Sequence, residues 1–128
     1  MIYLDTSVAL AQLLAEDHCP PAHLWQETLV SSKLLQYEMW NRINARSLTE
    51  SHDESLRTLL GSVAFLELSP TVLARALEPF PAPVRTLDAL HLASAAFLIE
   101  RAQEVTLATY DRRMQEAARG LGIPLYEL

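Results

Sequence analysis

The chain has 128 residues, half of them hydrophobic, and only three are glycine. This length allows one domain with a substantial core but not two, so we expect residues 1–128 to form a single domain. The formal net charge is −6, without the basic footprint that is usual in nucleic-acid-binding proteins. Acids that hold metal ions no longer act as repulsive surface charge, so the composition does not exclude a nucleic-acid substrate.

Membrane and secretory features are not predicted. No apolar run approaches the roughly 20 residues that a membrane span needs, and the N-terminus resembles no signal peptide. The single cysteine, Cys19, cannot form an internal disulfide, which fits a reducing compartment. We therefore expect a cytoplasmic protein without a membrane association.

The first half of the chain begins with a short apolar run, Ile2 to Leu4, that leads directly into Asp5. This pattern predicts a buried parallel strand, and a helix follows at 7–16 with Thr6 or Ser7 as its cap. The later predicted elements of this half are a helix at 22–28, a strand at 29–30, and helices at 34–48 and 51–61.

The second half continues the alternation of strands and helices. We expect a strand at 63–68, a helix at 70–77, a loop imposed by three prolines, a helix at 87–101 capped by Thr86, a strand at 105–109, a helix at 111–121 and an edge strand at 124–126. Strands that alternate with helices predict a mostly parallel, roughly five-stranded sheet covered on both faces, in a three-layer α/β/α fold.

Four carboxylates occupy special positions in this pattern. Asp5 ends the first strand, Asp111 follows the strand at 105–109, Asp88 lies in the first turn of its helix, and Glu38 lies about one turn into its own. Because the carboxyl edge of a parallel sheet is where ligands bind, we expect these acids to converge there.

Each acid also has a structural interpretation. The negative charge of Asp88 would interact favourably with the dipole of its helix, and Asp111 would serve as an N-cap. Glu38 would form an ion pair with Arg42 that stabilises the helix by about 0.2–0.5 kcal/mol. Asp5 is the hardest to explain in this way, because a carboxylate at the end of a buried strand is costly unless it is paired, hydrogen-bonded or metal-bound. The coincidence of all four favours a functional interpretation.

Grouped carboxylates need a cation, and their hard oxygen atoms suit Mg²⁺ or Mn²⁺. Two such ions, roughly 3.5–4 Å apart, can stabilise the attacking and leaving oxygens in phosphodiester hydrolysis. A nearby carboxylate can then orient or deprotonate the attacking water.

The motifs resemble those of PIN domains, and most closely the VapC-like toxins of prokaryotic toxin–antitoxin pairs. The resemblance spans the chain and is carried, in the family's order, by residues 1–7, Glu38 with Arg42, residues 86–93 and residues 108–111. It implies a PIN-like fold and a metal-dependent endoribonuclease. It further implies a homodimer and inhibition by a cognate antitoxin. The metal-binding and catalytic residues that it implies are Asp5, Glu38, Asp88 and Asp111.

Several polar residues are candidates for substrate binding: Thr6, Ser7, Arg42, Arg85 and Arg112. Each also has a structural interpretation, as a helix cap, an ion pair or a solvated charge. We expect His91 to be a satisfied, partly buried histidine rather than a metal ligand. The trio His18, Cys19 and His23 lacks the spacing and the fourth ligand of a zinc site.

Two other functions are open. The first is a catalytically silent PIN-fold binding module, against which the four mutually repelling acids argue. The second is a phosphohydrolase of the haloacid-dehalogenase type, which requires a second aspartate where this chain has Ser7. Nucleotide-binding glycine motifs are absent.

Overall fold

The computed structural model describes residues 1–128. Its sheet has four parallel strands in the order β3-β2-β1-β4. The strands are β1 (Ile2–Leu4), β2 (Leu29–Ser32), β3 (Val63–Leu66) and β4 (Thr106–Ala108). The central strand β1 places Tyr3 opposite Val30 on one side and Leu107 on the other. Parallel pairing throughout confirms the predicted α/β class.

The fifth expected strand is reduced to a single bridge. Leu107 forms a parallel bridge with Leu125, supported by two hydrogen bonds of 2.8 Å from the N–H of Leu107 to Pro124 and from the N–H of Tyr126 to Leu107. Pro124 has no N–H to donate, which limits the extension of this edge.

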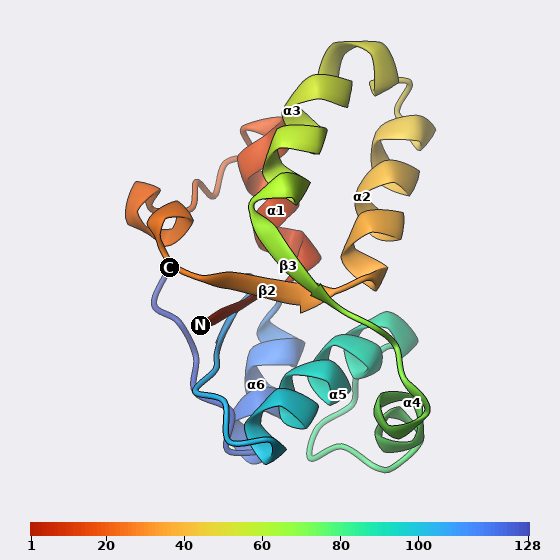
Figure 1. The fold of residues 1–128 in the computed structure, drawn as a ribbon, viewed down its shortest axis with the longest axis vertical. Coiled ribbons are helices and arrows are strands. Elements are labelled where there is room, and N and C mark those ends of the chain that lie inside the picture. The colour runs from red at the N-terminus through yellow and green to blue at the C-terminus, as the bar shows by residue number, and fades with distance from the viewer.

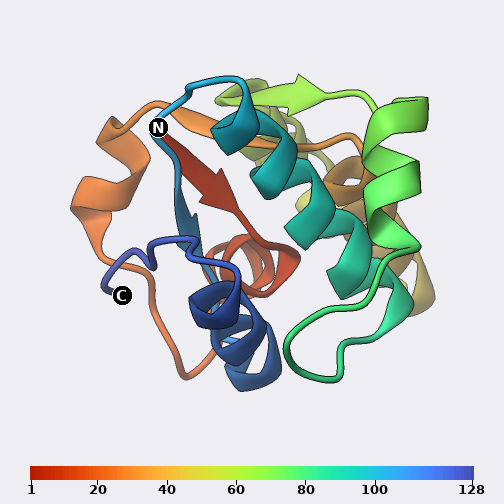
Figure 2. The ribbon, with the colours of Figure 1, turned by 90° about the horizontal axis from the view of Figure 1, so that it is seen from below.

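Helices cover both faces of the sheet (Figures 1 and 2). One face carries α1 (Thr6–Leu14), α2 (Leu34–Ala45) and α3 (Thr49–Gly61), and the other carries α5 (Thr86–Glu100) and α6 (Arg112–Gly120), with α4 (Pro70–Ala76) beside α5. A 3₁₀-helix, η1 (Ala22–Gln26), precedes β2. None of the helices combines the length and the apolar character that a membrane crossing would need.

Two apolar clusters form the core because successive residues of β1 point to opposite faces. Leu4 packs with Val8, Leu35 and Met39 beneath α1 and α2. Tyr3, the preceding residue, packs in the cluster that α5 and α6 cover. The residues of β1 are therefore buried on both faces of the sheet, and Asp5 follows directly at the end of this buried strand.

Some predicted boundaries were wrong by a few residues, and capping explains part of the difference. Asp5 itself, not Thr6 or Ser7, caps α1 and accepts a hydrogen bond from the Ser7 N–H. Thr86 is the first residue of α5 rather than its cap, which is Arg85. Asp111 precedes α6 as its N-cap and accepts hydrogen bonds from two N–H groups of the first turn.

Backbone geometry accounts for other differences. Helix α2 ends at Ala45 instead of 48, because Ser47 adopts a positive φ of 55° that an α-helix cannot continue. Helix α3 then starts at Thr49, two residues earlier than predicted. The segment 22–28 forms only a 3₁₀-helix that ends at Gln26. The carbonyl of Thr28 already accepts from the Ile2 N–H of β1 at 2.8 Å.

Candidate active site

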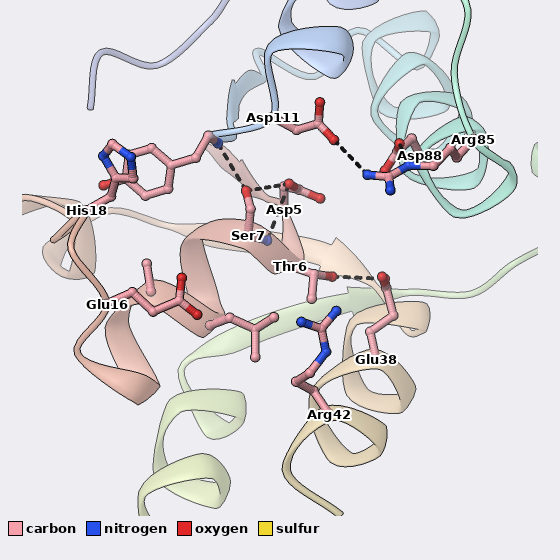
Figure 3. A pocket seen from close by; sticks show the side chains of 13 residues that line it. Asp5, Thr6, Ser7, Glu16, His18, Glu38, Arg42, Arg85, Asp88 and Asp111 are labelled. Carbon is pink, nitrogen blue, oxygen red and sulfur yellow. Dashed lines mark hydrogen bonds and ion pairs between the residues drawn. The ribbon is translucent and has the colours of Figure 1, made fainter. Parts of the chain in front are cut away.

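A pocket of about 260 Å³ opens at the carboxyl edge of the sheet, and all four predicted acids line it. Asp5 comes from the end of β1, Glu38 from α2, Asp88 from α5 and Asp111 from the start of α6 (Figure 3). Two features of the fold bring these four acids together, although they are far apart in the sequence. Strands β1, β2 and β4 end at the same edge, and the helices that carry the acids begin near it.

Asp5 is buried, with 4% of its surface exposed, and the chain holds one of its two carboxylate oxygens. Its Oδ2 accepts from the Ser7 hydroxyl at 2.6 Å and from the Thr109 hydroxyl at 2.7 Å. Ser7 is itself fixed by the N–H of Tyr110 at 3.0 Å. Oδ1 makes no hydrogen bond within the protein, so it can accept an outside ligand.

Glu38 repeats this arrangement from the opposite side of the pocket. Its Oε1 accepts from the Thr6 hydroxyl at 2.8 Å and lies 2.6 Å from Nε2 of His91. Its Oε2 has no hydrogen-bond partner in the protein. The helical ion pair with Arg42, the structural interpretation of Glu38, is not formed. Arg42 extends from α2 into the same pocket (Figure 3).

Asp88 and Asp111 share one cation, Arg85. The guanidinium lies 3.5 Å from Oδ2 of Asp88 through Nε and 3.3 Å from Oδ2 of Asp111 through Nη2. The other oxygen of Asp111 accepts from the N–H groups of Arg113 and Met114, at 2.9 and 3.3 Å. Asp111 therefore caps α6 and also presents one oxygen to the pocket.

The surroundings of Asp88 shift the pKa of its carboxyl upward. Burial raises this pKa above its usual range, and the negative charges of Asp111 and Asp5 raise it further, whereas Arg85 opposes the shift. A single arginine therefore does not fully neutralise these acids. A divalent cation would do so more completely.

The residues fit a hard metal ion by chemistry. All four acids provide oxygen atoms, and Oδ1 of Asp5 and Oε2 of Glu38 are free to coordinate. No three Asp, Glu, His or Cys side chains are yet grouped closely enough to hold an ion. Arg85 contacts one oxygen of Asp88 and one of Asp111, so a metal ion that used these two oxygens would have to displace it.

The predicted substrate-binding residues divide into two groups. Thr6, Ser7, Arg42 and Arg85 line the pocket, whereas Arg112 does not. The two hydroxyls are already donors to Glu38 and Asp5, which makes them supports for the acids.

Sequence reasoning missed several contributors to the pocket. Thr109 holds Asp5, and His18 stacks on Tyr110 at the rim, with ring centroids 5.1 Å apart. Thr109 follows β4 directly, and its position beside an expected acid was the available signal. His23, in turn, pairs with the Tyr126 hydroxyl at 2.7 Å, away from His18 and from the exposed Cys19.

Comparison with known proteins places these features in a family. The sequence profile of the PIN domain matches residues 2–120. Ribonuclease VapC47 of Mycobacterium tuberculosis (strain CDC 1551 / Oshkosh) is 32% identical over 129 residues, covering 95% of this chain and 93% of the relative. Ribonuclease VapC46 of strain ATCC 25618 / H37Rv is 32% identical over 126 residues, with the same coverage. Ribonuclease VapC35 of the CDC 1551 / Oshkosh strain is 29% identical, covering 96% and 93%.

Proposed function

This chain belongs to the PIN domain family, and from this we propose that it is a metal-dependent endoribonuclease and the toxin of a toxin–antitoxin pair. The observation that carries the proposal is the convergence of Asp5, Glu38, Asp88 and Asp111 on one pocket. The names of its ribonuclease relatives support RNA as the substrate.

We assign the four acids to Mg²⁺ or Mn²⁺. Asp5, Asp88 and Asp111 lie on one side of the pocket, and Glu38 approaches from α2 (Figure 3). When bound, one or two such ions neutralise the scissile phosphate and acidify water. Crowded carboxylates repel one another, and bound ions would offset this repulsion.

The chain's own residues divide the remaining tasks. Glu38 orients the attacking water through its free oxygen and accepts a proton from it. The water oxygen forms a bond to phosphorus, the bond from phosphorus to the leaving ribose oxygen breaks, and a proton returns to that oxygen. Arg42 and Arg85 contact the phosphate oxygens, a role for which a guanidinium is well suited.

The decisive experiment compares wild type with Asp5→Asn in an RNA-cleavage assay, with Mn²⁺ and with EDTA. Asparagine keeps the shape of the side chain and removes one metal-binding charge. Asp53→Asn is the matched control, because Asp53 lies on α3 and pairs only with Arg57 at the surface. We expect cleavage by wild type and Asp53→Asn, only with Mn²⁺, and none by Asp5→Asn.

Other outcomes would point elsewhere. Equal cleavage by Asp5→Asn would mean a contaminating nuclease or a misplaced site. No cleavage by any folded variant, together with no stabilisation by Mn²⁺, would favour the silent binding module.

The proposal extends to partners and location. The toxin assignment entails a cytoplasmic protein, a homodimer and a cognate antitoxin. An arginine of the antitoxin that entered the pocket would repeat the contact that Arg85 already makes with Asp88 and Asp111. A complex whose acids remained open and metal-loaded while cleavage was blocked would contradict this route of inhibition.

A further inference from the structure

A chain of buried polar groups runs from the sheet to Glu38. Nε2 of His91 lies 2.6 Å from Oε1 of Glu38, and Nδ1 lies 2.8 Å from the Tyr3 hydroxyl. The N–H of Ser32, at the end of β2, donates to that hydroxyl at 3.1 Å. His91 is 1% exposed, and Tyr3 and Ser32 have no exposed surface. The chain reaches the pocket at Glu38 and, through a longer contact of 3.4 Å from Nε2 of His91, at the Thr6 hydroxyl.

We propose that His91 is a positioning residue for Glu38. Its ring, anchored to the sheet by Tyr3, holds one carboxylate oxygen and leaves the other free in the pocket, where it would face a bound metal ion or the attacking water. The inference deepens the proposed function and rests on it for the role of Glu38. The positioning itself is a property of the metal-free protein.

Packing alone does not require these polar groups. An apolar side chain of similar size would fill the space between α5 and β1 without needing buried hydrogen-bond partners. Here each polar group is satisfied by the next, and the last partner is a carboxylate at the pocket. Buried networks of this kind fix a side chain's orientation when every member is satisfied.

Glu38 also needs support more than the other acids do. Asp5 and Asp111 are short side chains that each accept hydrogen bonds from residues of their own helix start, and Asp5 accepts a further one from Thr109. Glu38 has one more rotatable bond and receives no hydrogen bond from its own helix. Its two donors, Thr6 and His91, come from α1 and α5, so its position depends on contacts between elements.

The test uses His91→Leu, His91→Gln and Tyr3→Phe in the full chain. Glutamine can place an amide N–H where Nε2 lies, so it should rescue the contact that leucine loses. Ser94→Ala is the control, since Ser94 is equally buried on α5 but donates only to the carbonyl of Leu90. Melting temperatures identify variants that fail to fold.

The first readout needs neither metal nor RNA. Carbon-13 relaxation of the Glu38 side chain in the metal-free protein should show increased motion in His91→Leu and a smaller increase in Tyr3→Phe. His91→Gln and Ser94→Ala should remain like wild type. Equal order of Glu38 in all folded variants would overturn the proposal, whether or not the protein cleaves RNA.

The second readout concerns the active form. Partners that orient metal ligands typically contribute ~10–100-fold to metal affinity or activity. We expect His91→Leu to lose this much in Mn²⁺ affinity or in kcat, with KM for RNA nearly unchanged and with recovery in His91→Gln. Wild type that neither binds Mn²⁺ nor cleaves RNA would refute the proposed function, and the relaxation experiment would still decide the positioning. A fall in melting temperature alone, with normal Mn²⁺ affinity and kcat, would show a merely structural histidine.

Discussion

Nε2 of His91 lies 2.6 Å from Oε1 of Glu38, and the two side chains are 1% and 19% exposed. Burial by itself would lower the pKa of His91. The neighbouring Tyr3, Glu38 and Asp5 outweigh burial and raise this pKa from 6.5 to about 10. The folded protein therefore favours the protonated form of this ring more than the unfolded chain does.

This relationship predicts how stability depends on pH. Folding raises the pKa of His91, so protonation of this ring stabilises the folded state. The stabilisation is complete below the unfolded pKa of 6.5 and is lost as the pH rises through about 10. We expect the unfolding free energy of the metal-free protein to fall across this window, and to fall less steeply in His91→Gln. Urea denaturation in EDTA at several pH values measures both slopes. Parallel slopes would contradict the pKa assignment.

Arg85 should compete with metal for Asp88 and Asp111. Its side chain is 71% exposed, so it can leave the acids at little cost. We expect Arg85→Gln to lower the melting temperature of the metal-free protein and to bind Mn²⁺ more tightly, because no internal cation must be displaced. A tenfold gain in affinity would add about 1.4 kcal/mol of stability at saturating metal.

Thermal shift during a Mn²⁺ titration measures this competition. Arg46→Gln is the control, since Arg46 is exposed just beyond the end of α2 and lies outside the pocket. Identical Mn²⁺ affinities for wild type and Arg85→Gln would mean that Arg85 does not oppose metal binding. If Arg85 also contacts RNA, the same variant should raise KM for RNA.

The sequence carried enough information to predict the parallel sheet and the elements that bear the acids. The apolar run before Asp5 and the helix that begins near Asp88 can each be recognised from a short stretch of sequence. The spacing of apolar residues in such a stretch indicates the secondary structure directly. Convergence of Asp5, Asp88 and Asp111 then follows from parallel topology, because the strands end at one edge. Glu38 was predicted to lie near the same edge because its helix follows the strand at 29–30. In the structure this strand extends to Ser32.

The supports of these acids could not be predicted from the sequence. The contact of Tyr3 with His91 joins residues 88 positions apart. It depends on how α5 crosses β1, and no periodicity encodes that crossing. The i to i+4 rule suggested Arg42 as the partner of Glu38. The structure has His91 and Thr6 instead, because tertiary contacts outweighed a helical pair of a few tenths of a kcal/mol.

Two glycines at helix ends provide a matched test of packing. A Cβ on Gly120, the last residue of α6, would clash with Cβ of Pro81, whereas one on Gly61, the last residue of α3, would meet nothing within 4 Å. We expect Gly120→Ala to destabilise the protein by about 1–3 kcal/mol through overpacking. Gly61→Ala should stabilise it by about 0.4–1 kcal/mol through the unfolded chain. Chemical denaturation measures both, and effects of the same sign would contradict the close approach of Pro81 to Gly120.

The acidic character of the chain predicts how salt affects RNA binding. Of the nine arginines, only Arg42 and Arg85 line the pocket. Each phosphate contact contributes about −0.7 to the slope of log K against log salt for single strands, so two or three contacts give a slope of roughly −1.4 to −2.1. The metal ions would supply the remaining attraction.

Fluorescence anisotropy with a short single-stranded RNA and the Asp5→Asn variant measures this slope without cleavage. Arg42→Gln should weaken binding and make the slope shallower by about 0.7, since one phosphate contact is lost. Arg46→Gln should leave both unchanged, because Arg46 lies outside the pocket. A slope several times steeper in the parent variant would mean that RNA is held by a wider basic surface, beyond the pocket at the edge of the sheet.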